Sequence, residues 1–229
     1  MLGANRLITQ ARVSFTQPLP LALMPRIEAI PGVARVAHSQ FFGGIYQDER
    51  NFFPQFAVDP ERLLDSYPEW KLDPAQREAF VRTKTGAIVG RKLADKFGFK
   101  IGDKLPLRSF IFTRKDGTRA WEWDIVGIFD GQDADWDNRS NLAYLNFGHF
   151  DEARQFGSGS AGVYIVRVDN PEKTSQLTQE FQLNGKTTHC GIDVFSLVKS
   201  DGGWKIAGLM WTQEPGACAE LKSRKQGVR

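Results

Sequence analysis

The chain has 229 residues, of which 41% are hydrophobic and 25% charged, a composition typical of a globular protein with a sizeable core. Its 30 basic and 27 acidic side chains are interspersed, so the charge pattern gives no indication of nucleic-acid binding. The most apolar N-terminal stretch, residues 19–24, is far shorter than the roughly 20 residues that span a bilayer, and no signal-peptide pattern is visible. We therefore expect no membrane-spanning helix.

The first eighty residues predict short strands and short helices separated by prolines. Pro31 ends one predicted helix, whereas Pro60 and Pro74 each favour the first turn of another, where a missing N–H costs nothing. Alternating or β-rich residues predict the strands. The predicted strands are 9–16, 33–39, 45–46 and 51–58, and the predicted helices are 21–30, 61–64 and 74–81.

Residues 86–107 are the most informative stretch of the chain. An apolar run at 87–89 predicts a buried strand, and the apolar residues that follow recur at helical spacing. Gly98 is suited to end this helix, because glycine readily adopts the left-handed conformation found there. A glycine–aspartate turn then predicts a second strand at 104–107. None of these positions needs a reactive side chain, so the stretch predicts architecture rather than catalysis.

The middle of the chain continues the mixture of strands and helices. A hairpin around Asp116-Gly117 is predicted between strands at 109–113 and 120–129. Further predicted elements are a strand at 142–145, a helix at 147–156 and a strand at 163–168. Because the elements show no regular strand–helix–strand repeat, we predict the α+β class, with mixed sheets and short helices.

The last fifty residues predict a different kind of structure. Three strand candidates, 181–183, 187–198 and 204–212, are joined by tight-turn sequences at Asn184-Gly185 and at 201–203. This pattern predicts a C-terminal antiparallel β-meander, followed by a basic tail. We expect one domain at residues 1–175 and another at 176–229, with a junction between Thr174 and Phe181.

The order and spacing of several motifs resemble the MacB-like periplasmic core domain of ABC transporter permeases. The residues that carry the resemblance are 27–36 (IEAIPGVARV), 56–61 (FAVDPE), 89–94 (VGRKLA), 99–107 (FKIGDKLPL) and 123–129 (WDIVGIF). The resemblance covers about residues 1–175 and implies a two-lobed, non-catalytic domain at the periplasmic face of the inner membrane. It also implies membrane-spanning permease segments, an ATP-binding subunit and a periplasmic adaptor or substrate as partners.

The C-terminal segment resembles instead the closing strands of a nuclear transport factor two-like (SnoaL-like) cone. The resemblance rests on residues 184–209 (NGKTTHCGIDVFSLVKSDGGWKIAGL). It implies, as the alternative function, a small-molecule-binding or enzymatic pocket. The residues of this alternative pocket are His189, Asp193, Phe195, Trp204 and Trp211. A third hypothesis is that these strands form a dimerisation edge.

The candidate catalytic and metal-binding motifs are incomplete. Asp133, Asp135 and Asp137 alternate as in a calcium loop, but that loop would need a glutamate where Tyr144 stands. His189 and Cys190 are adjacent on a predicted strand and would point to opposite faces, so they do not form a nucleophile–base pair. We predict no catalytic residue, no metal site and no cofactor. Whether Cys190 and Cys218 form a disulfide stays open.

Aromatic residues are the candidates for partner contact. Phe41, Phe42 and Tyr46 lie in a dense aromatic group, and Trp136 lies in an acidic segment. Aromatic side chains at a loop tip commonly anchor protein partners. Alternatively, the same residues pack in the core and at the edge of two strands. The sequence leaves both interpretations open.

Overall fold

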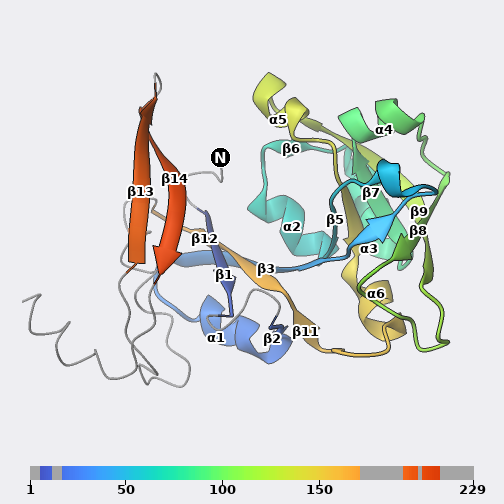
Figure 1. Cartoon of the computed structure of the whole chain (residues 1–229), viewed down its shortest axis with the longest axis horizontal. Coiled ribbons are helices and arrows are strands. Elements are labelled where there is room, and N and C mark those ends of the chain that lie inside the picture. The colour runs from blue at the N-terminus through green and yellow to red at the C-terminus, as the bar shows by residue number, and fades with distance from the viewer. Residues whose placement is uncertain (1–5, 12–16, 171–192, 201–202, 212–229) are drawn as a thin grey trace, which may run out of the picture. The chain divides into compact units, whose positions relative to one another are not determined.

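The computed structural model describes residues 6–11, 17–170, 193–200 and 203–211 (Figure 1). By the proximity of its Cα atoms, the chain divides into two compact units, residues 1–177 and 178–229. The domain boundary expected at residue 175 lies outside the described residues and stays a prediction.

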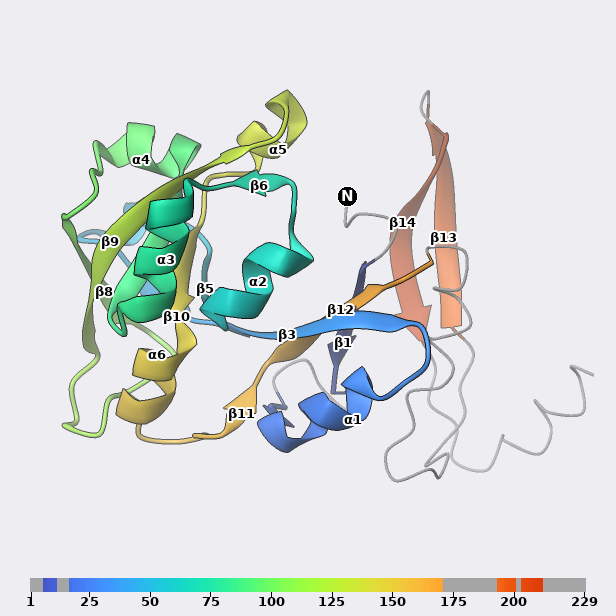
Figure 2. The ribbon, with the colours of Figure 1, turned by 180° about the vertical axis from the view of Figure 1, so that it is seen from behind.

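The described part of the first unit is built on a ten-stranded mixed sheet, with helices on both of its faces (Figures 1 and 2). The strands of the sheet are β1 (Arg6–Gln10), β3 (Val33–Phe41), β4 (Gly44–Ile45), β5 (Gln55–Val58), β6 (Trp70–Lys71), β7 (Gly86–Gly90), β8 (Lys104–Ser109), β9 (Ala120–Gly131), β10 (Ala143–Asn146) and β12 (Val163–Val168). Two short strands, β2 (Leu19–Pro20) and β11 (Ser160–Ala161), pair separately. The helices are η1 (Leu21–Leu23), α1 (Met24–Glu28), η2 (Glu49–Asn51), α2 (Pro60–Ser66), α3 (Pro74–Arg82), α4 (Arg91–Phe97), α5 (Ala134–Asn138) and α6 (Phe147–Ala153).

The strand order of the sheet is β1-β12-β3-β5-β10-β7-β9-β8-β4, and β6 pairs with β9 off this path. β10 is parallel to β5, and β7 is parallel to β9, whereas the other pairs are antiparallel. Parallel and antiparallel pairing within one sheet, together with short helices, confirms the predicted α+β class.

Each face of the sheet carries its own apolar cluster, because successive residues of a strand point to opposite faces. On β7, Ala87 and Val89 belong to one cluster and Ile88 belongs to the other. The first cluster includes Phe42 and the stacked pair Trp121 and Trp123, whose ring centroids are 6.3 Å apart. It also takes in residues of α4 and α6, whereas the second includes residues of α2 and α3. We call the first cluster the aromatic core.

The predicted segment 86–107 has the structure that its sequence indicates. β7 leads directly into α4, and Gly98 caps that helix with φ 71°, in the left-handed region. Gly90, at the junction, is required for another reason. A Cβ atom there would lie 1.9 Å from the carbonyl oxygen of Ser140. The Ser140 hydroxyl in turn accepts the amide N–H of Lys92 at 3.0 Å, which holds the chain after α5 against the start of α4.

The hairpin around Asp116-Gly117 is present, but its first strand is β8 and not the predicted segment 109–113. β8 ends at Ser109 and pairs with β9 in antiparallel register, with Leu105 opposite Trp123. The hydroxyl of Ser109 accepts the amide N–H groups of Ile111 and Phe112 at 3.2 and 2.9 Å. These bonds turn the backbone, because a serine side chain competes with the strand ladder for nearby N–H groups.

In the second unit the structure describes two strands, β13 (Asp193–Ser200) and β14 (Gly203–Trp211). They pair in antiparallel register, from Asp193 opposite Trp211 to Ser200 opposite Gly203. The last two strands of the expected meander are therefore confirmed as a hairpin. The third candidate strand, residues 181–183, lies outside the described residues.

Candidate binding pocket and contact surface

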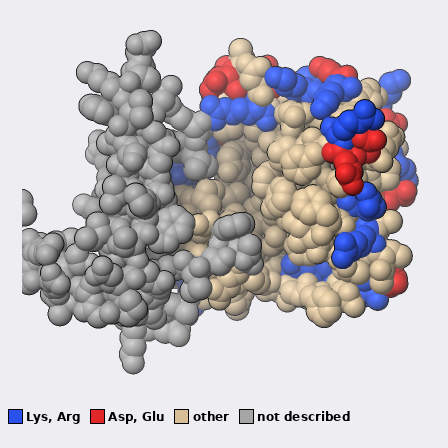
Figure 3. All heavy atoms as spheres, viewed as in Figure 1, with Lys and Arg blue, Asp and Glu red and all other residues tan. Residues whose placement is uncertain are grey.

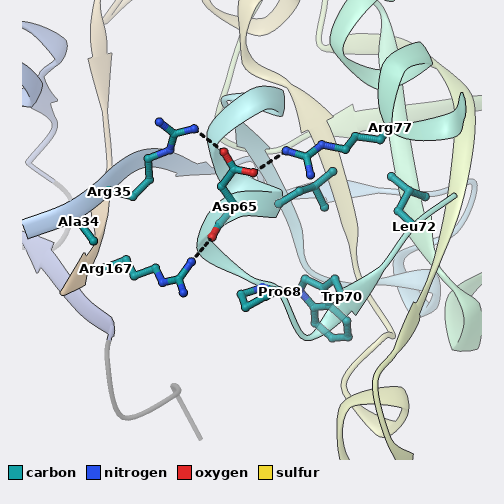
Figure 4. Close-up of a pocket in the computed structure, with 9 residues that line it drawn as sticks. Ala34, Arg35, Asp65, Pro68, Trp70, Leu72, Arg77 and Arg167 are labelled. Carbon is teal, nitrogen blue, oxygen red and sulfur yellow. Dashed lines mark hydrogen bonds and ion pairs between the residues drawn. The ribbon is translucent and has the colours of Figure 1, made fainter. Parts of the chain in front are cut away.

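A pocket of about 530 Å³ opens between β3, β12, α2, α3 and the segment that leads into β6 (Figure 4). The described residues that line it are Ala34, Arg35, Leu64, Asp65, Pro68, Trp70, Leu72, Arg77 and Arg167. A volume of this size is within the range of small-molecule sites, roughly 300–1,000 Å³. Of these residues, three are arginines and one is a carboxylate.

Two aspartate–proline pairs position the helices that border the pocket. Asp59 accepts the amide N–H groups of Glu61 and Arg62, and Pro60 occupies the first turn of α2. Asp73 and Pro74 start α3 in the same way. An aspartate cap satisfies amide donors that the helix leaves unpaired, so these local sequences fix where each helix begins.

Asp65, near the end of α2, is the centre of the arginine cluster. Arg77 donates to its Oδ1 at 2.5 Å, and Arg35 donates to its Oδ2. Arg167 donates to the backbone carbonyl oxygen of Asp65 at 2.9 Å. Figure 4 shows the guanidinium groups of Arg35 and Arg77 on opposite sides of the carboxylate. One residue thus gathers three cationic groups from β3, α3 and β12.

The electrostatics of Asp65 follow from this arrangement. Partial burial opposes ionisation of the carboxyl group and would raise its pKa. The hydrogen bonds from Arg77 and Arg35, with their positive charges, outweigh burial and hold the pKa of Asp65 below its ordinary value. Asp65 is therefore ionised at neutral pH and pairs with the guanidinium groups of Arg35 and Arg77, while Arg167 bonds its backbone carbonyl oxygen.

The rest of the pocket is apolar. Leu64 and Trp70 are buried members of the cluster beneath α2 and α3, and Leu72 packs against that cluster. The indole N–H of Trp70 donates to the hydroxyl of Tyr144 at 3.2 Å, which fixes the ring in place. The pocket thus joins a cationic side to an apolar side.

An ion pair between Arg6 of β1 and Glu69 stabilises the chain near the pocket. The side chain of Arg6 is buried and donates to both carboxylate oxygens of Glu69, at 2.7 and 2.8 Å. It also donates to the carbonyl oxygen of Ser66 at 2.9 Å and lies over the ring of Tyr67. A bidentate pair of this kind holds the chain after α2 against the edge strand of the sheet.

The structure contradicts the prediction that Phe42 contacts a partner. Phe42 is fully buried in the aromatic core, where its ring packs edge-on against Trp121 and Trp123 at centroid distances of 5.4 and 6.1 Å. A side chain enclosed in this way has no surface to offer a partner. The prediction for Phe42 is therefore wrong, and its core-packing alternative holds.

Phe41, Tyr46 and Trp136 are half-buried, and their predicted role in partner contact stays a prediction. Tyr46 packs edge-on against Phe97 at 5.3 Å, and Trp136 packs edge-on against Trp70 at 4.8 Å. The structure does not bring these residues together into one site with the arginine pocket, except that Trp136 touches one of its lining residues.

The alternative pocket in the C-terminal segment is not described at the level of side chains. His189 lies outside the described residues. Asp193 and Phe195 are placed on β13, and Trp204 and Trp211 on β14, by backbone pairing alone. The pocket predicted from the SnoaL-like resemblance therefore stays a prediction.

The three alternating aspartates lie in and before the short helix α5, where each carboxylate has a local partner. Asp133 accepts the amide N–H of Trp136 at 3.0 Å and Asp137 accepts that of Gly131 at 2.6 Å. Asp135 pairs with Arg139 at 2.9 Å. Asp133 thus caps α5, and Asp135 and Asp137 bond to residues near that helix, so the three carboxylates are engaged separately and do not surround one ion.

An exposed apolar surface lies at the edge of the sheet beside β4, and it includes Phe110 and Ile111, which the sequence did not single out. Phe52, Phe110 and Ile111 are 44%, 50% and 47% exposed. Phe52 forms a β-bridge with Ile45, and the amide of Phe110 donates to the carbonyl oxygen of Gly43 at 2.9 Å, so the two flank the same short strand. We call these three residues the edge patch. The signal missed was the turn at Ser109, which moves residues 110 and 111 out of the predicted strand.

The visible face of the first unit carries charged residues of both signs. Figure 3 shows acidic and basic side chains close together along its margin, with a broad uncharged area between them. Among the described residues, no helix is both long and apolar enough to cross a membrane.

The fold is similar to that of a periplasmic region whose structure has been solved. The periplasmic region of MacB from Actinobacillus actinomycetemcomitans superimposes with a TM-score of 0.52 at 9% identity, covering 100% of this chain and 95% of that one. At this identity, the similarity shows the fold alone. No protein-family model and no curated protein sequence matches the chain.

Two further solved structures are similar at lower TM-scores. The extracellular domain of the noncanonic ABC-type transporter YknZ from Gram-positive bacteria has a TM-score of 0.49 at 12% identity, covering 76% of this chain and 87% of that one. A domain of a putative permease protein from Porphyromonas gingivalis has a TM-score of 0.44 at 17% identity, covering 86% and 79%. The SnoaL-like resemblance of the C-terminal segment receives no support from these structures.

Proposed function

We propose that this chain is a non-catalytic extracytoplasmic domain of an ABC-type transporter permease, located at the periplasmic face of the inner membrane. The observation that carries the proposal is the similarity of the fold to that of the periplasmic region of MacB, at a TM-score of 0.52. In such a system, ATP hydrolysis belongs to another chain or domain, and membrane-spanning permease segments join this domain to it.

In this proposal the domain relays conformational change to a periplasmic adaptor or substrate, which requires a stiff body. The ten-stranded sheet supports that requirement, because apolar clusters cover both of its faces. Close-packed interiors have low compressibility and transmit displacement rather than absorb it. No reactive group is needed for this task.

The edge patch is the best candidate for the partner contact. Its three large apolar side chains are exposed beside β4, which is the terminal strand of the sheet. Exposed apolar patches commonly mark protein contact sites. Phe41 lies next to the patch, with its ring centroid 6.5 Å from that of Phe52.

The location is tested by inserting an epitope into the exposed turn at Asp116-Gly117 of the full natural reading frame, expressed in its own host. Gly117 has φ 84° and the turn is closed by local hydrogen bonds, so an insertion there leaves the sheet intact. We expect antibody to reach the epitope in spheroplasts without detergent. An epitope that becomes accessible only after the inner membrane is permeabilised would contradict the proposal.

The partner contact is tested with a photo-crosslinking residue in place of Phe110. We expect a discrete crosslinked product with another protein of the transporter. The control is the same residue in place of Glu78, an exposed position on α3 that pairs with Arg82 of the same helix. Equal products from the two positions would argue against a specific contact at the edge patch.

A further inference from the structure

We propose that the arginine pocket binds a small amphipathic carboxylate, a molecule with one carboxylate group on an aliphatic body. The pocket has a cationic side formed by Arg35, Arg77 and Arg167 and an apolar side that includes Leu64 and Trp70 (Figure 4). This inference does not depend on the transporter function, because it rests on the pocket alone.

The charge of the pocket favours an anion. With Asp65 ionised, its described lining residues carry three positive charges and one negative charge. A bound carboxylate would lower this excess, whereas a cation would add to it. Guanidinium groups also match a carboxylate in geometry, because their planar N–H donors can meet both of its oxygens.

The arginines have donors to spare. A guanidinium group carries five N–H donors. Among the described residues, the contacts of Arg35 and Arg77 with Asp65 each engage one terminal nitrogen, and Arg167 engages one with the backbone carbonyl oxygen. About half of the surface of the Arg35 and Arg77 side chains remains exposed, at 43% and 44%. The remaining N–H groups therefore can reach a ligand.

Asp65 holds the cationic side in place before any ligand arrives. Long arginine side chains lose conformational freedom when they bind, and this loss weakens binding. In this pocket the bonds to Asp65 already restrict all three side chains. The hydrogen bond from Trp70 to Tyr144 likewise fixes the apolar side. The pocket is thus organised for a ligand with both an anionic and an apolar part.

The experiment is isothermal titration calorimetry of the full chain with sodium octanoate as the probe. Two variants, Arg77→Gln and Arg167→Gln, each remove one positive charge from the pocket. The matched control is Arg108→Gln on β8, an arginine whose side chain is 67% exposed and which does not line the pocket. Circular dichroism checks that every variant is folded. Acetate, inorganic phosphate and 1-octanol separate the anionic from the apolar contribution.

We expect octanoate to bind at one saturable site and each pocket variant to weaken it about tenfold or more, as loss of a charge-assisted hydrogen bond implies. Arg108→Gln should leave the affinity unchanged, and acetate, phosphate and 1-octanol should each bind more weakly than octanoate. The proposal is overturned if 1-octanol binds as tightly as octanoate, if phosphate binds more tightly, or if octanoate shows no saturable binding. It is also overturned if Arg108→Gln weakens binding as much as the pocket variants.

Discussion

Two regions of the first unit reach ordered structure by different routes. The segment from β7 to β8 is assembled from neighbours in the sequence, with a strand, a glycine-capped helix and a turn in succession. The arginine pocket is assembled from β3, the neighbouring helices α2 and α3, and β12, which lies about a hundred residues further along the chain. Local sequence patterns thus specify the framework of strands and helices, whereas the concave site arises only where elements from different parts of the chain meet.

The largest expected change in stability is at Gly90, where β7 leads into α4. In Gly90→Ala, the added Cβ atom would lie 1.9 Å from a backbone oxygen of Ser140, and backbone cannot move aside as a flexible side chain can. We expect a loss of more than about 4 kcal/mol in the free energy of unfolding, or failure to fold. Urea denaturation followed by circular dichroism measures it.

The control is Gly102→Ala, at a position with φ 96° where a Cβ atom would meet nothing within 4 Å. Only backbone strain applies there, so the expected loss is about 1 kcal/mol. If both variants lose the same stability, the close approach of Ser140 is not the reason that position 90 requires glycine.

The second prediction separates the core from the surface at Phe42. Because its ring is fully buried against two tryptophans, Phe42→Ala should lower the free energy of unfolding by about 3 kcal/mol, from lost burial and the cavity left behind. Thermal and urea unfolding measure this loss. A variant that keeps its stability but loses its partner would restore the contact role that the sequence suggested.

The third prediction concerns the pH dependence of the pocket. In the folded chain the pKa of Asp65 lies below its ordinary value of 3.8, so the unfolded state takes up the proton first as the pH falls. Its stabilising contribution is therefore complete above about pH 5 and is lost as the pH falls through the folded-state pKa. Asp65→Asn should lose less than about 1 kcal/mol at pH 7, because the group is partly exposed.

The difference between the wild-type chain and Asp65→Asn should shrink towards zero as the pH falls below the folded-state pKa. Urea denaturation series at pH 7, 4 and 2.5 follow this difference. A difference that is constant with pH would show that the ion pairs of Asp65 contribute nothing to stability.

The smallest effect on stability is expected at the edge patch. The double variant Phe110→Ser, Ile111→Ser changes side chains that are about half exposed, so the free energy of unfolding should change by at most about 0.5 kcal/mol. If the proposed function holds, the same variant should abolish co-purification with the proposed partner. A loss of several kcal/mol would instead place these residues in the packing of the sheet edge.

Much of the fold could be predicted from the sequence because its signals are local. Asp59-Pro60 and Asp73-Pro74 determined the starts of two helices, and Gly98 determined the end of another, through hydrogen bonds and backbone conformations that involve only near neighbours. The Asp116-Gly117 hairpin followed for the same reason, although Ser109 ended its first strand earlier than the strand-like residues after it suggested.

Tertiary structure alone decided which side chains are core, pocket or surface. Phe41 and Phe42 are identical neighbours in sequence, yet successive residues at the end of β3 face different surroundings, and only Phe42 enters the aromatic core. Nothing near Arg35, Arg77 or Arg167 in the chain marks them as companions. They meet at Asp65 because the pairing of β12 with β3 and the packing of α2 against β3 and α3 bring the two strands to the neighbouring helices α2 and α3, a tertiary outcome that no local pattern encodes.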